Sequence, residues 1–396
     1  MTPTLPERAP SAPVSYDAVL LTSFGGPENQ DDVLPFLRNV TRGRGIPDER
    51  LEEVAHHYRA FGGVSPINAQ NRALQAALQI ELDARGLDLP VLWGNRNWDP
   101  YLADALRAAH AAGHRRLLAV VTSAYSSYSG CRQYREDLAA ALDTTGLAGE
   151  MSIDKVRQYF DHPGFVTPFV DGVGAGLAAL ATGLGDGGDL ARDAHVVFVT
   201  HSIPSVAAQA SGPPGAGLGA EGAYGAQHRA VAELVMASLA AQTDGDANQH
   251  SGLGAGVAWS VAFQSRSGSP ATPWLEPDIN DHLAELAAQG TKAVVIAPIG
   301  FVSDHMEVLW DLDEEASATA RELGLLVERA PTPGVHPAFV SGLVDLVQER
   351  HRAAGEPAEK PERPALSPLG PWYDVCRAGC CAPSRGQARP AVAGLG

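Results

Sequence analysis

Two segments of the chain carry residues suited to proton transfer and metal binding. In VVFVTHSIP, His201 directly follows an apolar run typical of a buried strand. In APIGFVSDHMEVLWDLDEEA, Glu307, Asp311 and Glu315 follow a second such run at intervals of four residues, which places them on one face of a helix. A neutral imidazole beside a carboxylate suits Fe(II), Co(II) or Zn(II), and it also suits proton abstraction near neutral pH. We therefore expect His201 and Glu307 to meet at one site.

Each of these features also has an ordinary structural explanation. A histidine beside a strand is more often structural than catalytic, and the chain has 13 histidines. A row of carboxylates is equally typical of a solvent-exposed helix face. If the row is functional, its hard oxygen donors offer a path along the helix for a divalent cation or for protons. We expect Ser303 to be the N-cap of this helix.

A third segment, TSAYSSYSGCRQYRED (122–137), is unusually rich in hydroxyl and aromatic side chains. Such a loop suits a flat aromatic ligand, because rings stack on it while Arg132 or Arg135 pairs with its carboxylates. The alternative is an ordinary hydroxyl-rich loop at the end of a strand.

The four cysteines are divided between this loop, which contains Cys131, and the C-terminal segment, which contains Cys376, Cys380 and Cys381. Four cysteines in 396 residues are too few for a disulfide scaffold. Four thiolates match the ligand number of one 2Fe–2S cluster and of one tetrahedral zinc site. The C-x3-C-C spacing is not a ferredoxin pattern, so free thiols are a third alternative.

Short apolar runs alternate with helix-period segments through most of the chain, which predicts parallel sheets covered by helices on both faces. The runs form two sets, about 18–122 and 195–298, so we predict two similar α/β domains facing a cleft. Active sites of such folds lie at the carboxyl ends of the strands. The segments that follow the predicted strands are 23–27, 123–134, 201–204, 264–274 and 300–307.

Composition limits the possible partners and location. There are 29 basic and 46 acidic side chains, a net charge of −17, which disfavours nonspecific binding to nucleic acid or anionic lipid. No apolar run approaches the roughly 18–20 residues that span a bilayer. The N-terminal MTPTLPERAPSAP lacks the pattern of a secretory signal. We expect a cytoplasmic protein with no nucleic-acid partner and no stable membrane insertion.

Six segments, in this order, resemble the ferrochelatase family, whose members insert ferrous iron into a porphyrin. The resemblance covers about residues 17–350. It rests on LLTSFGGPE, FGGVSPIN, SAYSSYSGCRQYRED, THSIP, FQSRSGSPATPWLEPDI and PIGFVSDHMEVLWDLDEEA. It implies two Rossmann-like domains of the chelatase type, with parallel sheets flanked by helices and a cleft between them.

With this resemblance the chain divides into five parts. They are a disordered N-terminus (1–15), an N-terminal Rossmann-like domain (16–155), a C-terminal Rossmann-like domain (156–330), a C-terminal helix packing back on the fold (331–352), and a linker with a cysteine-containing tail (353–396).

The resemblance also implies roles for individual residues. His201 and Glu307 match the family's catalytic metal-site pair, and Asp311 and Glu315 match its acidic helix as candidates for the metal path. Ser65, Tyr134 and Arg42 match porphyrin contacts, with Tyr128 as a rival of Tyr134. Some relatives have a metal-ligating Tyr after the first strand. This chain has Phe24 there, which has no donor atom and is expected to pack against the macrocycle, and Trp274 is a candidate wall of the cleft.

Similarity to actinobacterial members implies that Fe(II) enters coproporphyrin III, giving Fe-coproporphyrin III in haem b biosynthesis. It also implies a 2Fe–2S cluster held by Cys131, Cys376, Cys380 and Cys381. The alternatives are a protoporphyrin IX ferrochelatase, another tetrapyrrole metal chelatase, and a noncatalytic iron or haem sensor. The family includes monomers and homodimers.

Overall fold

The computed structural model describes residues 14–43, 45–241, 250–267, 271–352, 361–384 and 386–394. Residues 1–13 of the predicted disordered N-terminus (1–15) lie outside these ranges. Val14 pairs with His351, at the end of the last helix. Residues 353–360 of the predicted linker also lie outside the described ranges.

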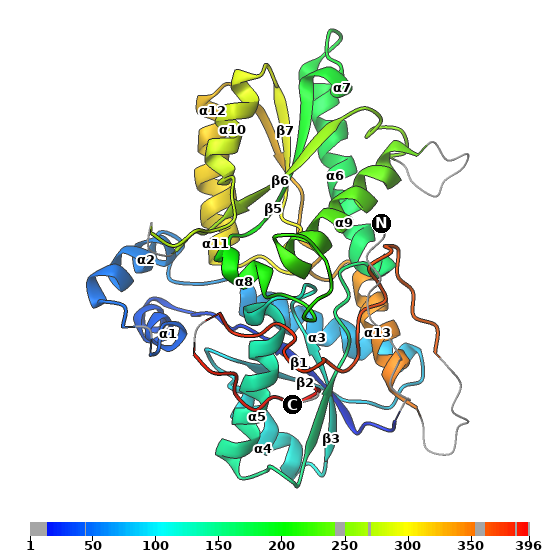
Figure 1. The fold of residues 1–396 in the computed structure, drawn as a ribbon. Helices are drawn as coiled ribbons and strands as arrows, with labels where there is room; N and C mark the ends of the chain where they lie inside the picture. Colours follow the sequence, from blue (N-terminus) through cyan, green and yellow to red (C-terminus); the bar gives the residue numbers. More distant parts are fainter. Residues whose placement is uncertain are drawn as a thin grey trace.

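The strands of the described chain form two parallel four-stranded sheets, which Figure 1 shows one above the other. The first sheet has the order β2-β1-β3-β4, and the second has the equivalent order β6-β5-β7-β8. This confirms the predicted α/β fold with two parallel sheets. The strands of the first sheet are β1 (Ala18–Ser23), β2 (Val91–Asn95), β3 (Arg116–Val121) and β4 (Ser152–Lys155). Those of the second are β5 (Ala194–His201), β6 (Ala258–Gln264), β7 (Ala293–Ala297) and β8 (Leu326–Arg329).

The apolar-run criterion missed β4 and β8, which are edge strands of four residues each. Their sequences are SIDK and LVER, and neither strand is fully buried. A strand at an edge is only partly covered, so its sequence alternates with charged residues instead of forming a continuous apolar run.

Helices flank both sheets (Figure 1). Those of the first half are η1 (Gln30–Asp32), α1 (Val33–Val40), α2 (Asp48–Ala60), α3 (Ile67–Ala84), α4 (Leu102–Ala111), η2 (Tyr128–Arg132) and α5 (Gln133–Thr145). The others are α6 (Pro163–Leu184), α7 (Leu190–Asp193), α8 (Ser205–Gln209), α9 (Gly222–Ala240), α10 (Ile279–Ala288), α11 (Met306–Val308), η3 (Leu309–Ala316), α12 (Ser317–Glu322) and α13 (Pro337–Arg350).

Two of these segments, η2 and η3, are π-helical. The π-helix is rare, and it occurs frequently at functional sites. Segment η2 lies in the hydroxyl-rich loop and contains Cys131, while η3 contains Asp311 and Glu315. Both irregular helices therefore coincide with segments whose side chains suggested chemistry.

Helix α6 is the central helix of the second half, and it packs against β7, α9 and α13. Within the described residues it is the one helix long and apolar enough to cross a membrane, but 67% of its most apolar window is buried inside the protein. This burial is typical of the core helix of a folded domain. Helix α13 contacts both α6 and α3 and so joins the two halves.

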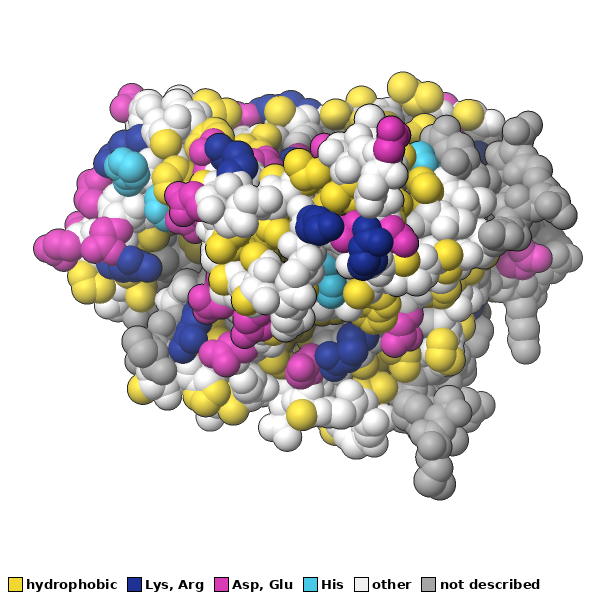
Figure 2. Space-filling view, turned by 90° about the horizontal axis from the view of Figure 1, so that it is seen from above, with side chains coloured by type: hydrophobic (Ala, Val, Ile, Leu, Met, Phe, Trp, Pro, Cys, Tyr) yellow, Lys and Arg dark blue, Asp and Glu magenta, His cyan; other side chains and the backbone are white. Residues whose placement is uncertain are grey.

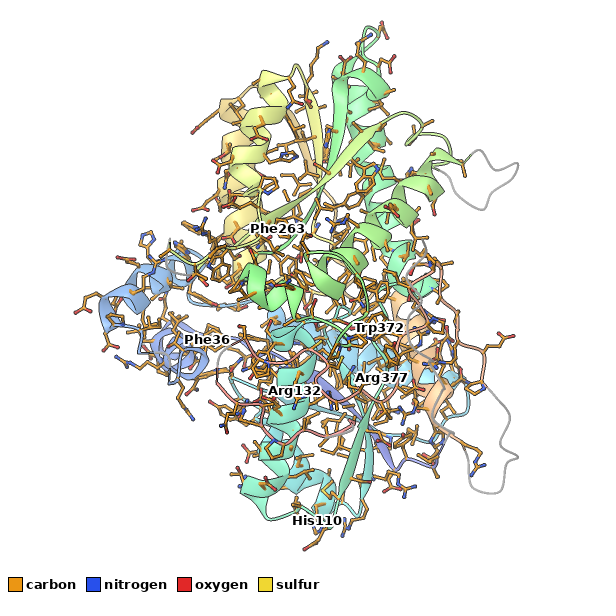
Figure 3. The ribbon with its side chains drawn as sticks, in the orientation of Figure 1. Phe36, His110, Arg132, Phe263, Trp372 and Arg377 are labelled. Atoms are coloured by element: carbon orange, nitrogen blue, oxygen red, sulfur yellow. The ribbon has the colours of Figure 1, made fainter. Side chains whose placement is uncertain are left out.

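The described part of the C-terminal segment is built into this core. Trp372 is only 1% exposed and meets Phe160 edge-on at 6.0 Å between ring centroids. Arg363 donates to the Trp372 carbonyl and to Asp374. Figure 3 shows Trp372 between the two halves. The tail thus contributes core packing as well as three of the cysteines.

The face in Figure 2 carries both acidic and basic side chains. Basic side chains there stand beside acidic ones instead of gathering into a basic patch. On this face the basic side chains are too scattered to bind a polyanion, as the net charge of −17 leads us to expect.

We predict that Trp372→Ala destabilises the protein by about 3–5 kcal/mol, because it removes a fully buried indole and leaves a cavity. Leu366→Ala is the matched control, since Leu366 lies in the same segment but is 48% exposed, and its effect should stay within about 0.5 kcal/mol. Chemical unfolding of both variants measures the difference. Equal stabilities of the two variants would contradict a core role for the tail.

Candidate active site and thiol ring

His201 is the last residue of β5, a central strand that pairs with β6 and β7. Its side chain therefore lies at the carboxyl edge of the second sheet. The Nδ1 atom hydrogen-bonds the carbonyl oxygen of Ser202. A carbonyl only accepts, so Nδ1 carries the proton and a neutral ring has its lone pair on Nε2.

Glu307 faces the Nε2 edge of this ring. Its Oε2 atom lies 3.6 Å from Nε2 of His201, and the two side chains are 51% and 32% exposed. Glu307 is in α11, which follows the turn after β7, a neighbour of β5. The structure thus brings together the pair expected from the sequence, in a position that solvent can reach.

Asp311 lies next to this pair. Its Oδ2 atom accepts a hydrogen bond from the Ser265 hydroxyl and another from Nε2 of Gln264 at 3.2 Å. Burial, together with the charges of Glu307 and Glu315, raises the pKa of Asp311 to about 7, although the hydrogen bond from Ser265 opposes part of the shift. The side chain therefore changes protonation near neutral pH.

Glu315 completes the acidic row (Glu307, Asp311 and Glu315). It is exposed, and it accepts a hydrogen bond from the Trp310 indole at 2.8 Å. Trp310 in turn stacks on His57 of α2, with ring centroids 4.1 Å apart and planes at 6°. Met306 is buried in the apolar cluster of α1 and α2. The acidic row is therefore held by helices of the first half as well as by its own sheet.

The prediction that Ser303 caps this helix is wrong. The helix begins at Met306, and the residue at the cap position is His305, whose side chain makes no capping bond. The preceding turn is fixed by other contacts. The backbone N–H of Asp304 donates to Gln70, and the Asp304 carboxylate pairs with Arg329. Because these contacts are distant in sequence, the local pattern gave no sign of them.

The sequence suggested no individual role for three further residues of the site, Gln264, Ser265 and His305. Gln264 lies opposite His201 in the β5–β6 pairing, and its amide donates to Asp311 and to the Glu307 carbonyl. Ser265 has φ +59°, an unusual conformation for a non-glycine residue and one that recurs at functional sites. Burial lowers the pKa of His305. The charge of Glu307 opposes this shift, and the charge of His201 adds to it. The position of Gln264 and Ser265 directly after a strand was the available signal.

The predicted porphyrin contacts lie in different environments. Ser65 is buried beside Gly26. Tyr134 is buried beneath the Arg96 guanidinium, which lies 4.4 Å from the ring centroid. Arg42 is exposed at the end of α1 and donates to Asn39. Their roles stay predictions.

Three further residues that the sequence suggested for the porphyrin cleft, Tyr128, Phe24 and Trp274, make defined contacts within the protein. The Tyr128 hydroxyl donates to Glu136. Phe24 packs edge-on against Phe36 of α1. Trp274 pairs with Pro204, just after His201, and its indole N–H is buried without a hydrogen-bond partner among the described residues.

Arg132 and Arg135 are both buried against the C-terminal tail, which disagrees with the expectation that one of them pairs with the carboxylates of a ligand, while the stacking of a flat ligand on the loop stays a prediction. Arg132 is buried, pairs with Glu136 at 2.8 Å and donates to the Arg389 carbonyl. Arg135 is buried and donates to the Val392 carbonyl at 2.7 Å. Figure 3 shows Arg132 near the C-terminal tail. Both arginines hold the tail.

The four cysteines form one buried group, which we call the thiol ring (Cys131, Cys376, Cys380 and Cys381). Cys131 contacts Cys376 and Cys381, and Cys380 contacts the same two, its Sγ lying 4.0 Å from that of Cys381. Contact with Cys131 and Cys380 lowers the pKa of Cys376, and the charges of Arg135 and Lys155 lower it further. In the described ranges, no group of three or more His, Cys, Asp or Glu side chains stands in a metal-binding arrangement. The ring therefore shows thiols in contact, not a formed coordination site.

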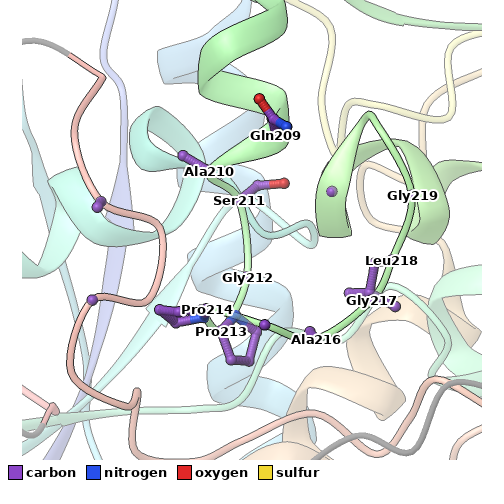
Figure 4. A pocket seen from close by; sticks show the side chains of 14 residues that line it. Gln209, Ala210, Ser211, Gly212, Pro213, Pro214, Ala216, Gly217, Leu218 and Gly219 are labelled. Atoms are coloured by element: carbon purple, nitrogen blue, oxygen red, sulfur yellow. The ribbon is translucent and has the colours of Figure 1, made fainter.

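A loop of the second half closes over the thiol ring. The Gly212 N–H donates to Sγ of Cys381 at 3.2 Å, and the Cys381 N–H donates to the Gly212 carbonyl at 3.1 Å. A cavity of about 360 Å³ opens here between residues 209–219, Gly222 and the tail residues Gly379 and Ala382 (Figure 4). Its lining is mostly Gly, Ala and Pro, so it offers few groups for chemistry.

Comparison with known proteins adds independent information. The sequence model of the ferrochelatase family matches residues 16–351. Relatives named coproporphyrin III ferrochelatase include those of Leifsonia xyli, 60% identical over 97% of this chain and 95% of that protein, and Streptomyces griseus, 56% identical over 96% and 97%. A Rhodopirellula baltica protein named ferrochelatase is 48% identical over 96% of each chain. Among solved structures, SirB of Bacillus subtilis with Fe3+ is 11% identical with a TM-score of 0.45, covering 84% of this chain and 94% of that one.

The raised pKa of Asp311 predicts how stability depends on pH. The pKa of Asp311 in the folded protein, about 7, exceeds the ordinary value of 3.8. Between these two pH values the unfolded chain therefore binds fewer protons than the folded chain. The stability that Asp311 contributes is consequently lost as the pH rises through 7. We expect the free energy of unfolding of Asp311→Asn, whose side chain cannot ionise, to increase relative to that of the wild type when the pH is raised from 5 to 8. The gain should be on the order of 2 kcal/mol after allowance for solvent screening. Urea unfolding of the metal-free protein at both pH values measures it, and a constant difference would contradict the raised pKa.

Proposed function

Because the chain belongs to the ferrochelatase family, we propose that it inserts Fe(II) into coproporphyrin III to give Fe-coproporphyrin III for haem b synthesis. The substrate assignment is supported by the relatives from Leifsonia xyli and Streptomyces griseus, which are named coproporphyrin III ferrochelatase and are similar over nearly the whole chain. The chemistry is carried by one observation: Nε2 of His201 lies 3.6 Å from Oε2 of Glu307, while Nδ1 of the same ring is hydrogen-bonded to the Ser202 carbonyl.

Metal insertion replaces two pyrrole protons of the macrocycle by one Fe(II), so two protons must leave for each iron that enters. Nε2 of His201 has the lone pair needed to accept a pyrrole proton or to donate to Fe(II). The Glu307 carboxylate supplies the opposite charge for the incoming cation, or accepts the second proton. Their exposure to solvent gives both the metal and the protons access to the site.

The rest of the acidic row extends from this pair. Asp311, with its pKa near 7, exchanges protons at neutral pH, and Glu315 places a further carboxylate at an exposed position. We propose that Asp311 and Glu315 carry Fe(II) toward the site or protons away from it. Ser65, Tyr134 and Arg42 are the proposed porphyrin contacts, and Arg42 has an exposed guanidinium for a propionate.

We also propose that the thiol ring holds a 2Fe–2S cluster. Its four buried cysteines match the required number of thiolates, Arg135 and Lys155 lower the pKa of Cys376, and the Gly212 N–H donates to Sγ of Cys381. Bound there, such a cluster would supply one-electron chemistry, which iron insertion does not require. Its proposed role is therefore structural or regulatory. A zinc ion held by the same thiolates is the alternative outcome of the test below.

We propose a cytoplasmic location without stable membrane insertion. It is supported by the burial of α6, the one membrane-length apolar helix in the described ranges. A monomer and a homodimer are both compatible with the family.

The test of the main proposal is anaerobic insertion of Fe(II), followed by the loss of porphyrin fluorescence, with coproporphyrin III and protoporphyrin IX compared side by side. We expect a higher kcat/KM for coproporphyrin III. The opposite preference would make the protein a protoporphyrin IX ferrochelatase. Loss of fluorescence with neither porphyrin would favour another tetrapyrrole chelatase or a sensor. In the same assay His201→Ala should lose insertion by roughly 100-fold or more while still binding porphyrin, and full turnover would refute the role of His201.

Cys376→Ser tests the cluster. We expect the purified wild-type protein to show the visible absorbance of an iron–sulfur chromophore, and the variant to lose it because one of four ligands is gone. Metal analysis separates the alternatives, since two irons and two acid-labile sulfides per chain support a cluster and one zinc supports the tetrahedral site. Absorbance that persists in the variant would show that Cys376 is not a ligand.

A further inference from the structure

His201 is held from behind by a buried tyrosine. The hydroxyl of Tyr224, at the start of α9, donates to the backbone carbonyl of His201 at 2.8 Å. Tyr224 is 7% exposed, so this bond is shielded from water. It fixes the end of β5 at the residue whose imidazole faces Glu307.

A carbonyl oxygen only accepts, so the Tyr224 hydroxyl is the donor of this bond, and the neighbouring side chains show where its proton can go. Burial lowers the pKa of His228 to about 3, so the ring is neutral and carries one proton. That proton is on Nδ1, which lies 2.7 Å from the Tyr224 carbonyl, so Nε2 accepts from the Thr200 hydroxyl at 2.9 Å. Because the Thr200 proton goes to His228, Oγ1 of Thr200 can only accept from Tyr224, so the phenol proton is shared between Oγ1 of Thr200 and the His201 carbonyl, both at 2.8 Å.

Tyr224 is also connected to the thiol ring. Its backbone N–H donates to Oγ of Ser211 at 2.8 Å, and the Ala223 N–H donates to the Ser211 carbonyl at 3.2 Å. The next residue, Gly212, exchanges two hydrogen bonds with Cys381. Gly212 has φ +82°, and a Cβ there would lie 2.7 Å from that of Ala223, so the loop and α9 are in close contact.

Helix α9 is tied to the other side of the ring as well. The Gln227 side chain accepts from the Ser126 N–H at 2.7 Å and donates to the Ser126 hydroxyl at 3.1 Å. Ser126 is in the loop that leads into η2 and Cys131. The start of α9 therefore contacts the loop that leads to Cys131 directly, and it is connected to Cys381 of the tail through Ser211 and Gly212.

We propose that Tyr224 is the positioning residue of His201 and that it couples the thiol ring to the catalytic site through Ser211 and Gly212. The ring, once assembled on its metal, holds Gly212; Gly212 and Ser211 hold the first turn of α9; and Tyr224 then fixes the His201 carbonyl. This rests on the proposed function of His201. It gives the cysteines a definite effect on iron insertion without an electron transfer.

Kinetics provide the first arm of the test. Tyr224→Phe keeps the ring and removes only the hydroxyl, so we expect kcat to fall by roughly tenfold or more, while KM for the porphyrin changes by less than about twofold. Tyr159→Phe is the matched control, because the Tyr159 hydroxyl donates to the Val121 carbonyl at 2.7 Å, at the end of a strand of the other sheet. It should leave kcat unchanged.

Hydrogen exchange followed by mass spectrometry provides the second arm and needs no turnover. Tyr224→Phe should speed exchange in peptide 199–205 by roughly three- to tenfold, the change expected for one lost hydrogen bond. Cys381→Ser should speed exchange in peptide 209–225 and also in 199–205. In the double variant, exchange in 199–205 should be no faster than in Tyr224→Phe alone, because the path is already interrupted.

Each alternative result has a distinct meaning. Additive effects of Tyr224→Phe and Cys381→Ser on peptide 199–205, or no effect of Cys381→Ser on it, would overturn the coupling. Kinetics of Tyr224→Phe that match those of Tyr159→Phe would overturn the positioning role. If instead His201→Ala turns over at the full rate, the proposed function itself fails, whatever the exchange data show.

Discussion

The position of one strand end determines most of this site. His201 ends β5, which pairs with β7 as far as Phe198 and with β6 as far as His201 itself, so the imidazole lies at the carboxyl edge of the sheet. The groups around it come from neighbouring strands. Gln264 ends the adjacent β6, and Glu307 follows the turn after β7. Parallel pairing places these carboxyl ends together, so residues separated by more than 100 positions in the sequence form one site.

The acidic row shows how an unfavourable charge arrangement is maintained. The three carboxylates of the row repel one another. Part of this repulsion is relieved because burial and the neighbouring carboxylates raise the pKa of Asp311 to about 7, so that its side chain is partly protonated at neutral pH. Donors from β6 and its following residue bind Asp311, and Trp310 binds Glu315. Trp310 and Met306 attach the same segment to α1 and α2. The site is therefore stabilised by both halves of the protein.

The C-terminal tail is attached by buried charges as well as by Trp372. Arg157 is fully buried and forms two parallel hydrogen bonds with Glu349 of α13, at 2.8 and 2.9 Å, and it also donates to the Pro364 carbonyl. Removing one partner of such a pair leaves a buried charge uncompensated, which costs more than the pair itself contributes. Arg132 and Arg135 bind the tail further along. These contacts place three cysteines against the one in η2.

The sequence by itself determined what depends on local composition. Apolar runs identified the buried strands, and the position just after a strand identified His201 and Glu307, because parallel strands deliver such residues to one edge. It did not identify β4 and β8, whose charged residues conceal edge strands, or the contacts of Asp304 that make Ser303 unnecessary as a cap. Only the tertiary structure decided that Arg132 and Arg135 face the tail, that Ser265 and Gln264 bind Asp311, and that four distant cysteines form one group. Each of these depends on chain segments that meet only after folding, so no local pattern records them.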